Sequence, residues 1–213
     1  MELLRLTLRL PGHEWLTRLQ AKRKDLKVAY KAFVLEQANF GEARGPDWKA
    51  WEDKTFPSRD MPPHEAAKCA GLQGEEPFAR YHLALHRAKH VDKKDITNQL
   101  ILRDIALQAG LDVARWEEDM KSGASVPLIA QDHQEAAAEG IFGVPTLYFG
   151  SGKPVFVKLD EGDWEGGDDA GLFDAVRAAV AERPYLLELK TPESAQRAEA
   201  SRKRYAKYTG QKA

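Results

Sequence analysis

Cysteine is nearly absent from this sequence of 213 residues, because Cys69 is the only one. A single thiol excludes an intrachain disulfide, a Cys-x-x-Cys redox pair and a zinc site built on several cysteines. Cysteine-poor chains are typical of reducing compartments, so we expect a cytoplasmic protein. Lone cysteines in alanine-rich helices usually act as small apolar residues, so we expect Cys69 to be buried and unreactive.

Long apolar runs and an excess of charge of one sign are also missing. No segment approaches the roughly 20 apolar residues of a transmembrane helix. The N-terminal residues lack the apolar core and small-residue cleavage site of a signal peptide. Charge is balanced, with 32 Lys and Arg residues against 33 Asp and Glu residues, whereas nucleic-acid-binding domains are usually basic. We therefore expect a soluble protein that binds neither a membrane nor nucleic acid.

The N-terminal residues predict a strand, a helix and a second strand. Residues 4–10 alternate between leucine and polar side chains, which is typical of a strand with one apolar face. After Pro11-Gly12, a helical pattern begins at about residue 13, and residues 27–35 are rich in Val, Tyr and Phe like a second strand. We expect a right-handed βαβ unit, followed by a loop over 41–60.

The middle of the chain lacks a strand pattern, and strands return only near its C-terminal part. Five helices are predicted, over about 62–74, 75–90, 97–109, 112–123 and 126–139. Two strands joined by a glycine-rich turn and two further helices follow, over 146–149, 154–157, 172–182 and 191–208. We expect three parts: a discontinuous α/β domain (1–61 and 140–189), a helical insertion (62–139) and a basic C-terminal helix (190–213).

This order, β-α-β, helices, then β-β-α, resembles the DsbA-like family of the thioredoxin fold. Residues 140–149 carry the resemblance, because Gly-Ile-Phe-Gly-Val-Pro-Thr-Leu-Tyr-Phe is similar to the segment where the family places a cis-proline before a central strand. Residues 70–96 and 106–112 are similar to the helical insertion of the cytosolic branch. The resemblance covers roughly residues 25–182 and implies a thioredoxin-like α/β fold with an all-α insertion.

The sequence departs from this family where the redox cysteines would stand. In redox-active members a Cys-x-x-Cys pair follows the first strand, at the N-terminus of the first helix, and here that junction reads Pro11-Gly12-His13-Glu14. Dithiol exchange needs a second sulfur to resolve the mixed disulfide. We therefore expect a member of an oxidoreductase family that is itself inactive in exchange. Another interpretation of this junction is that the first dozen residues come from an aberrant translation start.

Two other classes of function stay open. Kappa-class glutathione transferases and 2-hydroxychromene-2-carboxylate isomerases resemble this topology, and an enzyme of that type would bind glutathione. They use a serine at the corresponding turn, and this chain has none there. The second class is a non-catalytic module that binds a peptide or a partner protein. Apart from glutathione, the sequence indicates no cofactor.

Four residues form the candidate ligand site: Gly12, His13, Val144 and Pro145. The resemblance implies a cis Val144–Pro145 bond, which would expose the backbone N–H and C=O of Val144 to an extended peptide or a small thiol ligand. His13 stands where a reactive cysteine would stand, so it is the candidate catalytic residue, as a general base. The simpler interpretation is a solvated histidine in the first turn of the helix.

Three histidines and the basic C-terminal segment complete the candidates. His82, His86 and His90 are four residues apart on one predicted helix, and two histidines at that spacing can bind zinc. No Glu follows in the His-Glu-x-x-His manner and a third ligand would have to come from elsewhere, so we expect no metal. Residues 190–213 contain seven basic and two acidic residues, which indicates a solvated helix or a surface for an acidic partner. A homodimer through the helical insertion is a further expectation.

Overall fold

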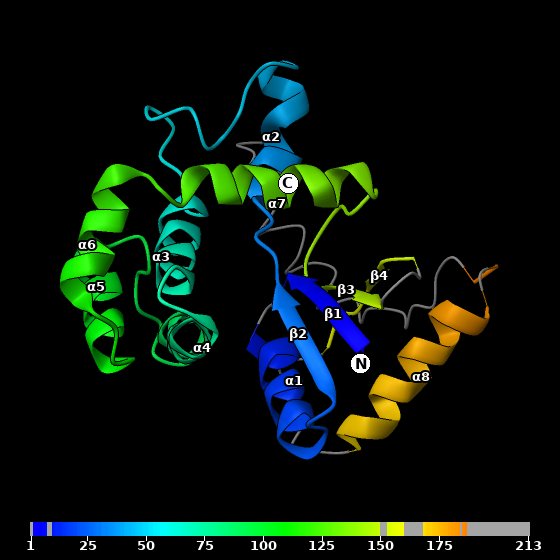
Figure 1. The fold of residues 1–213 in the computed structure, drawn as a ribbon. Coiled ribbons are helices and arrows are strands. Elements are labelled where there is room, and N and C mark those ends of the chain that lie inside the picture. Colours follow the sequence, from blue (N-terminus) through cyan, green and yellow to red (C-terminus); the bar gives the residue numbers. More distant parts are fainter. Residues whose placement is uncertain (1, 8–9, 150–152, 160–167, 184, 187–213) are drawn as a thin grey trace.

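The computed structural model describes residues 2–7, 10–149, 153–159, 168–183 and 185–186. The turn expected at 150–152 and the helix expected over 191–208 lie outside these residues. The chain begins with β1 (Glu2–Thr7), α1 (Leu10–Lys22) and β2 (Leu26–Tyr30), which confirms the β-α-β order (Figure 1). α1 begins at Leu10, earlier than predicted, because Pro11 fits the first turn of a helix, where its missing N–H has no intrahelical acceptor.

The prediction for the segment after β2 is wrong. β2 ends at Tyr30, and part of the expected strand end and loop forms a helix, α2 (Leu35–Arg44). α2 contains no buried residue, so it lacks the apolar stripe by which a helix is recognised in a sequence.

Five helices follow between residues 61 and 138, all within the described part of the chain. They are α3 (Met61–Gly71), α4 (Glu75–His90), α5 (Gln99–Gln108), α6 (Val113–Ser122) and α7 (Val126–Ala138). α3 to α6 share a core in which the Trp116 indole donates to the Ala66 carbonyl oxygen at 3.0 Å. Figure 1 shows these four helices to one side of the sheet, with α4 next to α1. None of the described helices is long and apolar enough to span a bilayer.

β3 (Thr146–Phe149) and β4 (Val155–Phe156) complete a four-stranded sheet in the order β2-β1-β3-β4. β1 runs parallel to β2 and antiparallel to β3. α8 (Asp169–Glu182) lies beside α1, and the two helices and β3 enclose one core that includes the buried Trp15, Leu147 and Phe173. This mixed sheet with α1 and α8 packed against it is the arrangement that the family resemblance implies.

Asp169 joins α8 to α1. Its fully buried carboxylate pairs with Arg18 and Lys22, each at 3.1 Å, and its carbonyl oxygen accepts the Trp15 indole N–H at 2.9 Å. Burial alone would raise the pKa of Asp169, but the hydrogen bonds from Arg18 and Lys22 lower it. The carboxylate therefore stays charged and holds together two helices that are distant in the sequence.

Candidate functional site

The N-terminus of α1 and the Val144–Pro145 bond lie at the same end of the sheet. Thr7, the last residue of β1, pairs with Thr146, the first residue of β3. α1 starts shortly after Thr7, and the Val144–Pro145 bond, which is cis, directly precedes Thr146. The strand register therefore brings the backbone of Gly12 and His13 toward Pro145; the His13 side chain lies outside the described part of the structure.

The backbone of Val144 is unpaired within the described residues. Its neighbours are engaged, because the Pro145 carbonyl oxygen accepts the Val157 N–H at 3.0 Å and the Gly143 carbonyl oxygen accepts the Thr146 hydroxyl at 2.7 Å. Val144 itself is half-buried, and neither its N–H nor its C=O forms a hydrogen bond to any residue that the structure describes. One donor and one acceptor are thus available beside the start of β3.

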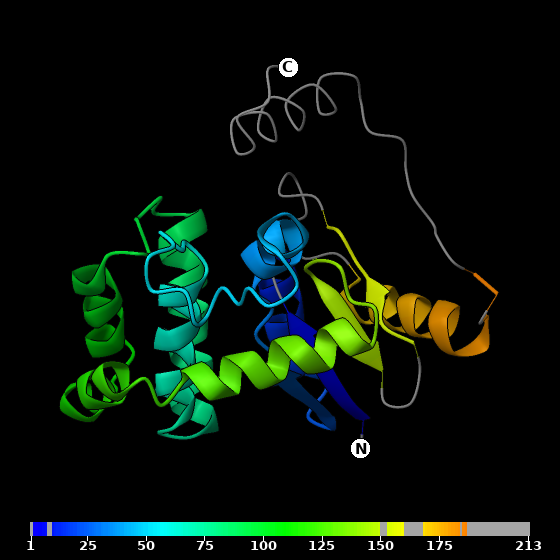
Figure 2. The same cartoon turned by 90° about the horizontal axis from the view of Figure 1, so that it is seen from above.

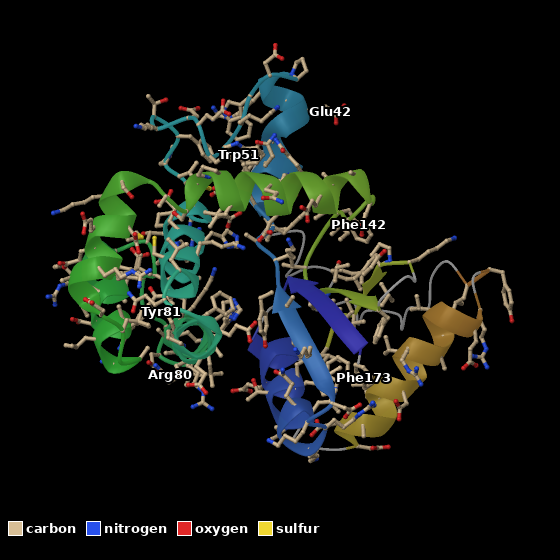
Figure 3. The ribbon with its side chains drawn as sticks, in the orientation of Figure 1. Glu42, Trp51, Arg80, Tyr81, Phe142 and Phe173 are labelled. Carbon is tan, nitrogen blue, oxygen red and sulfur yellow. The ribbon has the colours of Figure 1, made fainter. Side chains whose placement is uncertain are left out.

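Two exposed aromatic residues flank this backbone. Phe142 is 73% exposed and Phe156 on β4 is 40% exposed. Their ring centroids lie 5.4 Å apart, and Figure 3 shows Phe142 just beyond the end of α7. Exposed aromatic pairs beside unpaired backbone are typical of surfaces that bind a polypeptide.

A cleft of about 490 Å³ lies between α2 and the C-terminal end of α7. Phe33 and His133 are its most buried lining residues, at 2% and 5% exposure. The lining also contains small residues from both sides: Ala38 and Gly41 on α2, and Ala137 and Gly140 at the end of α7. The cleft continues to Phe142 and so ends two residues before Val144.

Two polar residues of α7 hold the linker that runs from β2 to α2. The buried Asp132 carboxylate accepts the Ala32 N–H at 2.8 Å and pairs with the Lys31 and Lys68 ammonium groups. On the next residue, His133, Nδ1 accepts the Val34 N–H at 3.2 Å. Figure 1 shows α7 crossing this linker between β2 and α2, and Figure 2 shows α7 from above. The position of α2 therefore depends on these contacts.

The hydrogen bond from Val34 fixes the state of His133. Because Nδ1 accepts, the proton of the neutral ring is on Nε2. Burial, with a smaller contribution from His64, lowers the pKa of His133 to about 4, so the ring is neutral at pH 7. Within the described residues, Nε2 has no hydrogen-bond partner. His133 therefore presents an uncharged N–H donor in the lining of the cleft.

Sequence reasoning missed Asp132 and His133, although a signal for them exists. Ile129, Asp132, His133 and Ala136 are all buried, and they occupy the i, i+3, i+4, i+7 positions of α7. Two polar residues at inward positions of a helix must find polar partners. Such a pair in a sequence therefore predicts a buried network of hydrogen bonds.

The α4 histidines form a row of rings, in line with their predicted spacing. Ring centroids are 4.6 Å apart for His82 and His86, and 6.0 Å apart for His86 and His90. The ring centroid of Tyr30, at the end of β2, lies 4.9 Å from that of His82. The row of histidines therefore lies at the same end of the sheet as the N-terminus of α1. Among the described residues, no group of His, Cys, Asp and Glu side chains is arranged to hold a metal.

Cys69 is fully buried in α3, as its sequence context predicts. Burial raises the pKa of its thiol to about 11. Because the thiolate is the reactive form, this raised pKa lowers the reactive fraction of Cys69 at neutral pH.

The family assignment follows from comparison with known proteins. The family model of the DSBA-like thioredoxin domain matches residues 11–174. The chain belongs to this family. This confirms the resemblance seen in the sequence and the thioredoxin-like fold.

Among curated proteins, the chain is similar to the ClpXP adapter protein SpxH of Bacillus subtilis, with 29% identity over 146 residues. This match covers 67% of the chain and 47% of SpxH, so the chain spans about half the length of that relative.

Two solved structures share the fold of this DsbA-like chain. The cytosolic disulfide reductase DsbM from Pseudomonas aeruginosa, solved with GSH, has a TM-score of 0.52 and 18% identity, over 82% of this chain and 99% of DsbM. A 2-hydroxychromene-2-carboxylate isomerase has a TM-score of 0.55 and 14% identity, over 83% of this chain and 94% of the isomerase.

Proposed function

We propose that this DsbA-like domain binds an extended polypeptide segment at Val144 and does not catalyse dithiol–disulfide exchange. The observation that carries the proposal is the backbone N–H and C=O of Val144, which no described residue pairs, beside the start of β3. A strand that adds to a sheet needs one donor and one acceptor of this kind, and the exposed rings of Phe142 and Phe156 add apolar area next to them. Pro145, Gly12 and His13 complete the proposed site.

The absence of exchange activity rests on sulfur chemistry. Exchange requires an attacking thiolate and a second sulfur that resolves the mixed disulfide. This chain has one cysteine, and burial of Cys69 keeps it in the thiol form. Pro11-Gly12-His13-Glu14 supplies no replacement sulfur at the start of α1.

The curated relative supports the binding half of the proposal. SpxH is named an adapter protein, and an adapter acts by binding other proteins. The chain spans about half of SpxH, so protein binding is the only property of SpxH that we propose for this chain. The scarcity of cysteine fits a reducing compartment, and a cytoplasmic location is part of the proposal.

Insulin reduction by dithiothreitol tests the catalytic half. The expected rate with the protein equals the rate with dithiothreitol alone, and Cys69→Ser leaves it unchanged. Turnover above this background that Pro145→Ala abolishes would overturn the proposed inactivity.

Calorimetry with glutathione separates the proposal from a glutathione-dependent isomerase or transferase. We expect no heat of binding at millimolar glutathione. A saturable heat that is lost in the His13→Ala variant would favour the enzyme instead.

Selection from a library of random dodecapeptides tests the binding half. Each selected peptide is then resynthesised with single N-methyl groups, because N-methylation removes the N–H that an added strand donates to the Val144 carbonyl oxygen. We expect methylation at one position to weaken binding about tenfold, the effect of one well-formed hydrogen bond. Selected peptides whose affinity is unchanged by methylation at every position would contradict strand addition.

A further inference from the structure

The cleft between α2 and α7 combines apolar walls with one buried polar side chain, His133. Two of its polar lining side chains are Gln37 and His133. The Gln37 amide is held by the protein itself, because its nitrogen donates one N–H to the Trp48 carbonyl oxygen at 3.1 Å and its oxygen accepts the Ala50 N–H at 2.8 Å. His133 Nε2–H has no partner within the described residues. A ligand that fills the cleft gains most when it places an acceptor on this nitrogen.

The cleft and the Val144 backbone are continuous. Gly140, Ile141 and Phe142 line the end of the cleft, and Gly143 and Val144 follow directly. The N–H groups of Phe142, Gly143 and Val144 donate no hydrogen bond to any described residue. A chain in extended conformation advances about 3.3 Å per residue. An extended ligand paired at Val144 therefore reaches the mouth of the cleft within two or three residues.

We infer that the α2–α7 cleft is a specificity pocket for the polypeptide bound at Val144, and that it takes a long uncharged side chain whose tip accepts a hydrogen bond from His133 Nε2. This inference rests on the proposed function, because the strand at Val144 delivers the side chain. Glutamine and tyrosine have the required apolar body and acceptor tip.

The charges around the cleft argue for an uncharged side chain. His133 is neutral at pH 7, so it offers no charge to balance a ligand carboxylate. Glu42, labelled in Figure 3, lines the cleft from α2 and repels a carboxylate. An aliphatic side chain would fill the space but leave the His133 N–H unpaired, which is unfavourable at a buried site.

Two alanines of α2 provide a matched pair of variants. Ala38 lines the cleft, whereas Ala43 does not, and both are exposed on a helix that contains no buried residue. Ala38→Trp fills the cleft, and Ala43→Trp adds the same side chain outside it. Neither substitution removes a core contact, and thermal unfolding of both proteins verifies that the fold is retained.

The experiment measures binding of the dodecapeptides selected on the wild-type protein. We expect Gln or Tyr to recur at one position, Ala38→Trp to weaken binding at least about tenfold, and Ala43→Trp to change it less than about twofold. Replacing the recurring Gln by norleucine, which keeps the apolar body, should weaken binding about tenfold. In wild-type protein labelled with ¹⁵N, peptide addition should shift the His133 Nε2 resonance.

The outcomes separate the two proposals. Peptides that bind Ala38→Trp as tightly as wild type, yet lose affinity on N-methylation, would overturn the pocket and leave strand addition at Val144 intact. Peptides whose binding is weakened by Ala38→Trp but by no N-methyl group would support the cleft as a binding site. They would overturn strand addition at Val144, and with it the claim that an added strand delivers the side chain to the cleft. A library that yields no binder would overturn both.

Discussion

His133 shows how a buried histidine is made into a hydrogen-bond donor that carries no charge. The Val34 N–H occupies Nδ1 at 3.2 Å, and the Phe33 and Trp51 rings lie 4.8 Å and 5.3 Å from the imidazole. Protonation would place a second N–H against the Val34 donor and a charge among aromatic rings. Both effects favour the neutral ring, in agreement with a pKa of about 4.

The lowered pKa of His133 predicts a loss of stability in mild acid. The ordinary pKa of histidine is about 6.5, so between pH 6.5 and 4 the unfolded chain binds a proton that the folded protein excludes. The stability that the neutral His133 ring contributes to the folded protein is therefore complete above pH 6.5, and it falls as the pH decreases below this value. Between pH 7 and pH 4.5, we expect the free energy of unfolding of wild type, measured with urea, to fall by on the order of 2 kcal/mol more than that of His133→Gln.

Burial lowers the pKa of His64 as well, so His64 also makes the protein less stable in acid. Because His64 is present in both wild type and His133→Gln, its effect is common to the two proteins. Equal losses for wild type and His133→Gln would show that His133 is not the titrating group.

Asp132 is the second residue on which the linker depends. Removing its carboxylate leaves the Ala32 N–H without an acceptor and Lys68 without its partner. We expect Asp132→Ala to lower the free energy of unfolding by about 3 kcal/mol, as for a broken buried ion pair. Glu135→Ala is the control, because this half-exposed carboxylate pairs with Lys31 at the surface and its loss should change stability by less than about 1 kcal/mol. Similar losses in both variants, measured by urea unfolding, would contradict the role of Asp132.

At the scale of elements, α2 differs from the other described helices, because each of those contains at least one buried residue. It contributes no buried residue, and Glu36 near its start bonds the Arg59 N–H at 2.8 Å. Helices of this kind open locally at a small fraction of the global free energy of unfolding. We expect native-state hydrogen exchange to be at least about a hundredfold faster for α2 amides than for amides of α3, which contains six buried residues. Equal protection of α2 and α3 would contradict this assignment.

The helices illustrate what a sequence can and cannot predict. The predicted helix over 75–90 coincides with α4, because acidic residues and Pro77 mark its start and Phe78, Tyr81 and Leu85 mark its inner face. The N-cap residues of α5 and α6 are Asn98 and Asp112, close to the predicted starts. α2 was missed because its position depends on the linker that Asp132 and His133 hold, a contact between residues about a hundred positions apart.

The same limit applies to the candidate site. Val144 and Pro145 could be chosen from the sequence because their local motif resembles a known family, and the strand register brings them to the end of the sheet where α1 begins. The cleft could not be predicted, because one of its walls is α2. His133 could have been found only from its inward position on α7.

For the whole molecule, the DsbA-like scaffold and the sulfur chemistry are separate features. The sheet, the α1–α8 pair joined by Asp169 and the helical core around Trp116 depend on packing and buried polar contacts. None of these contacts involves a cysteine pair. A fold of this type can therefore carry a binding site at Val144 without the reaction that redox-active members perform.

Hydrogen exchange at the Val144 amide tests the central claim most directly. With a selected dodecapeptide at saturation, we expect the Val144 N–H to exchange at least about tenfold more slowly, because it donates to the added strand. Amides of α5 serve as the internal reference and should be unchanged. Slower exchange at Val144 alongside an unchanged α5 is the predicted result. An unchanged rate at Val144 under saturating peptide would contradict the account.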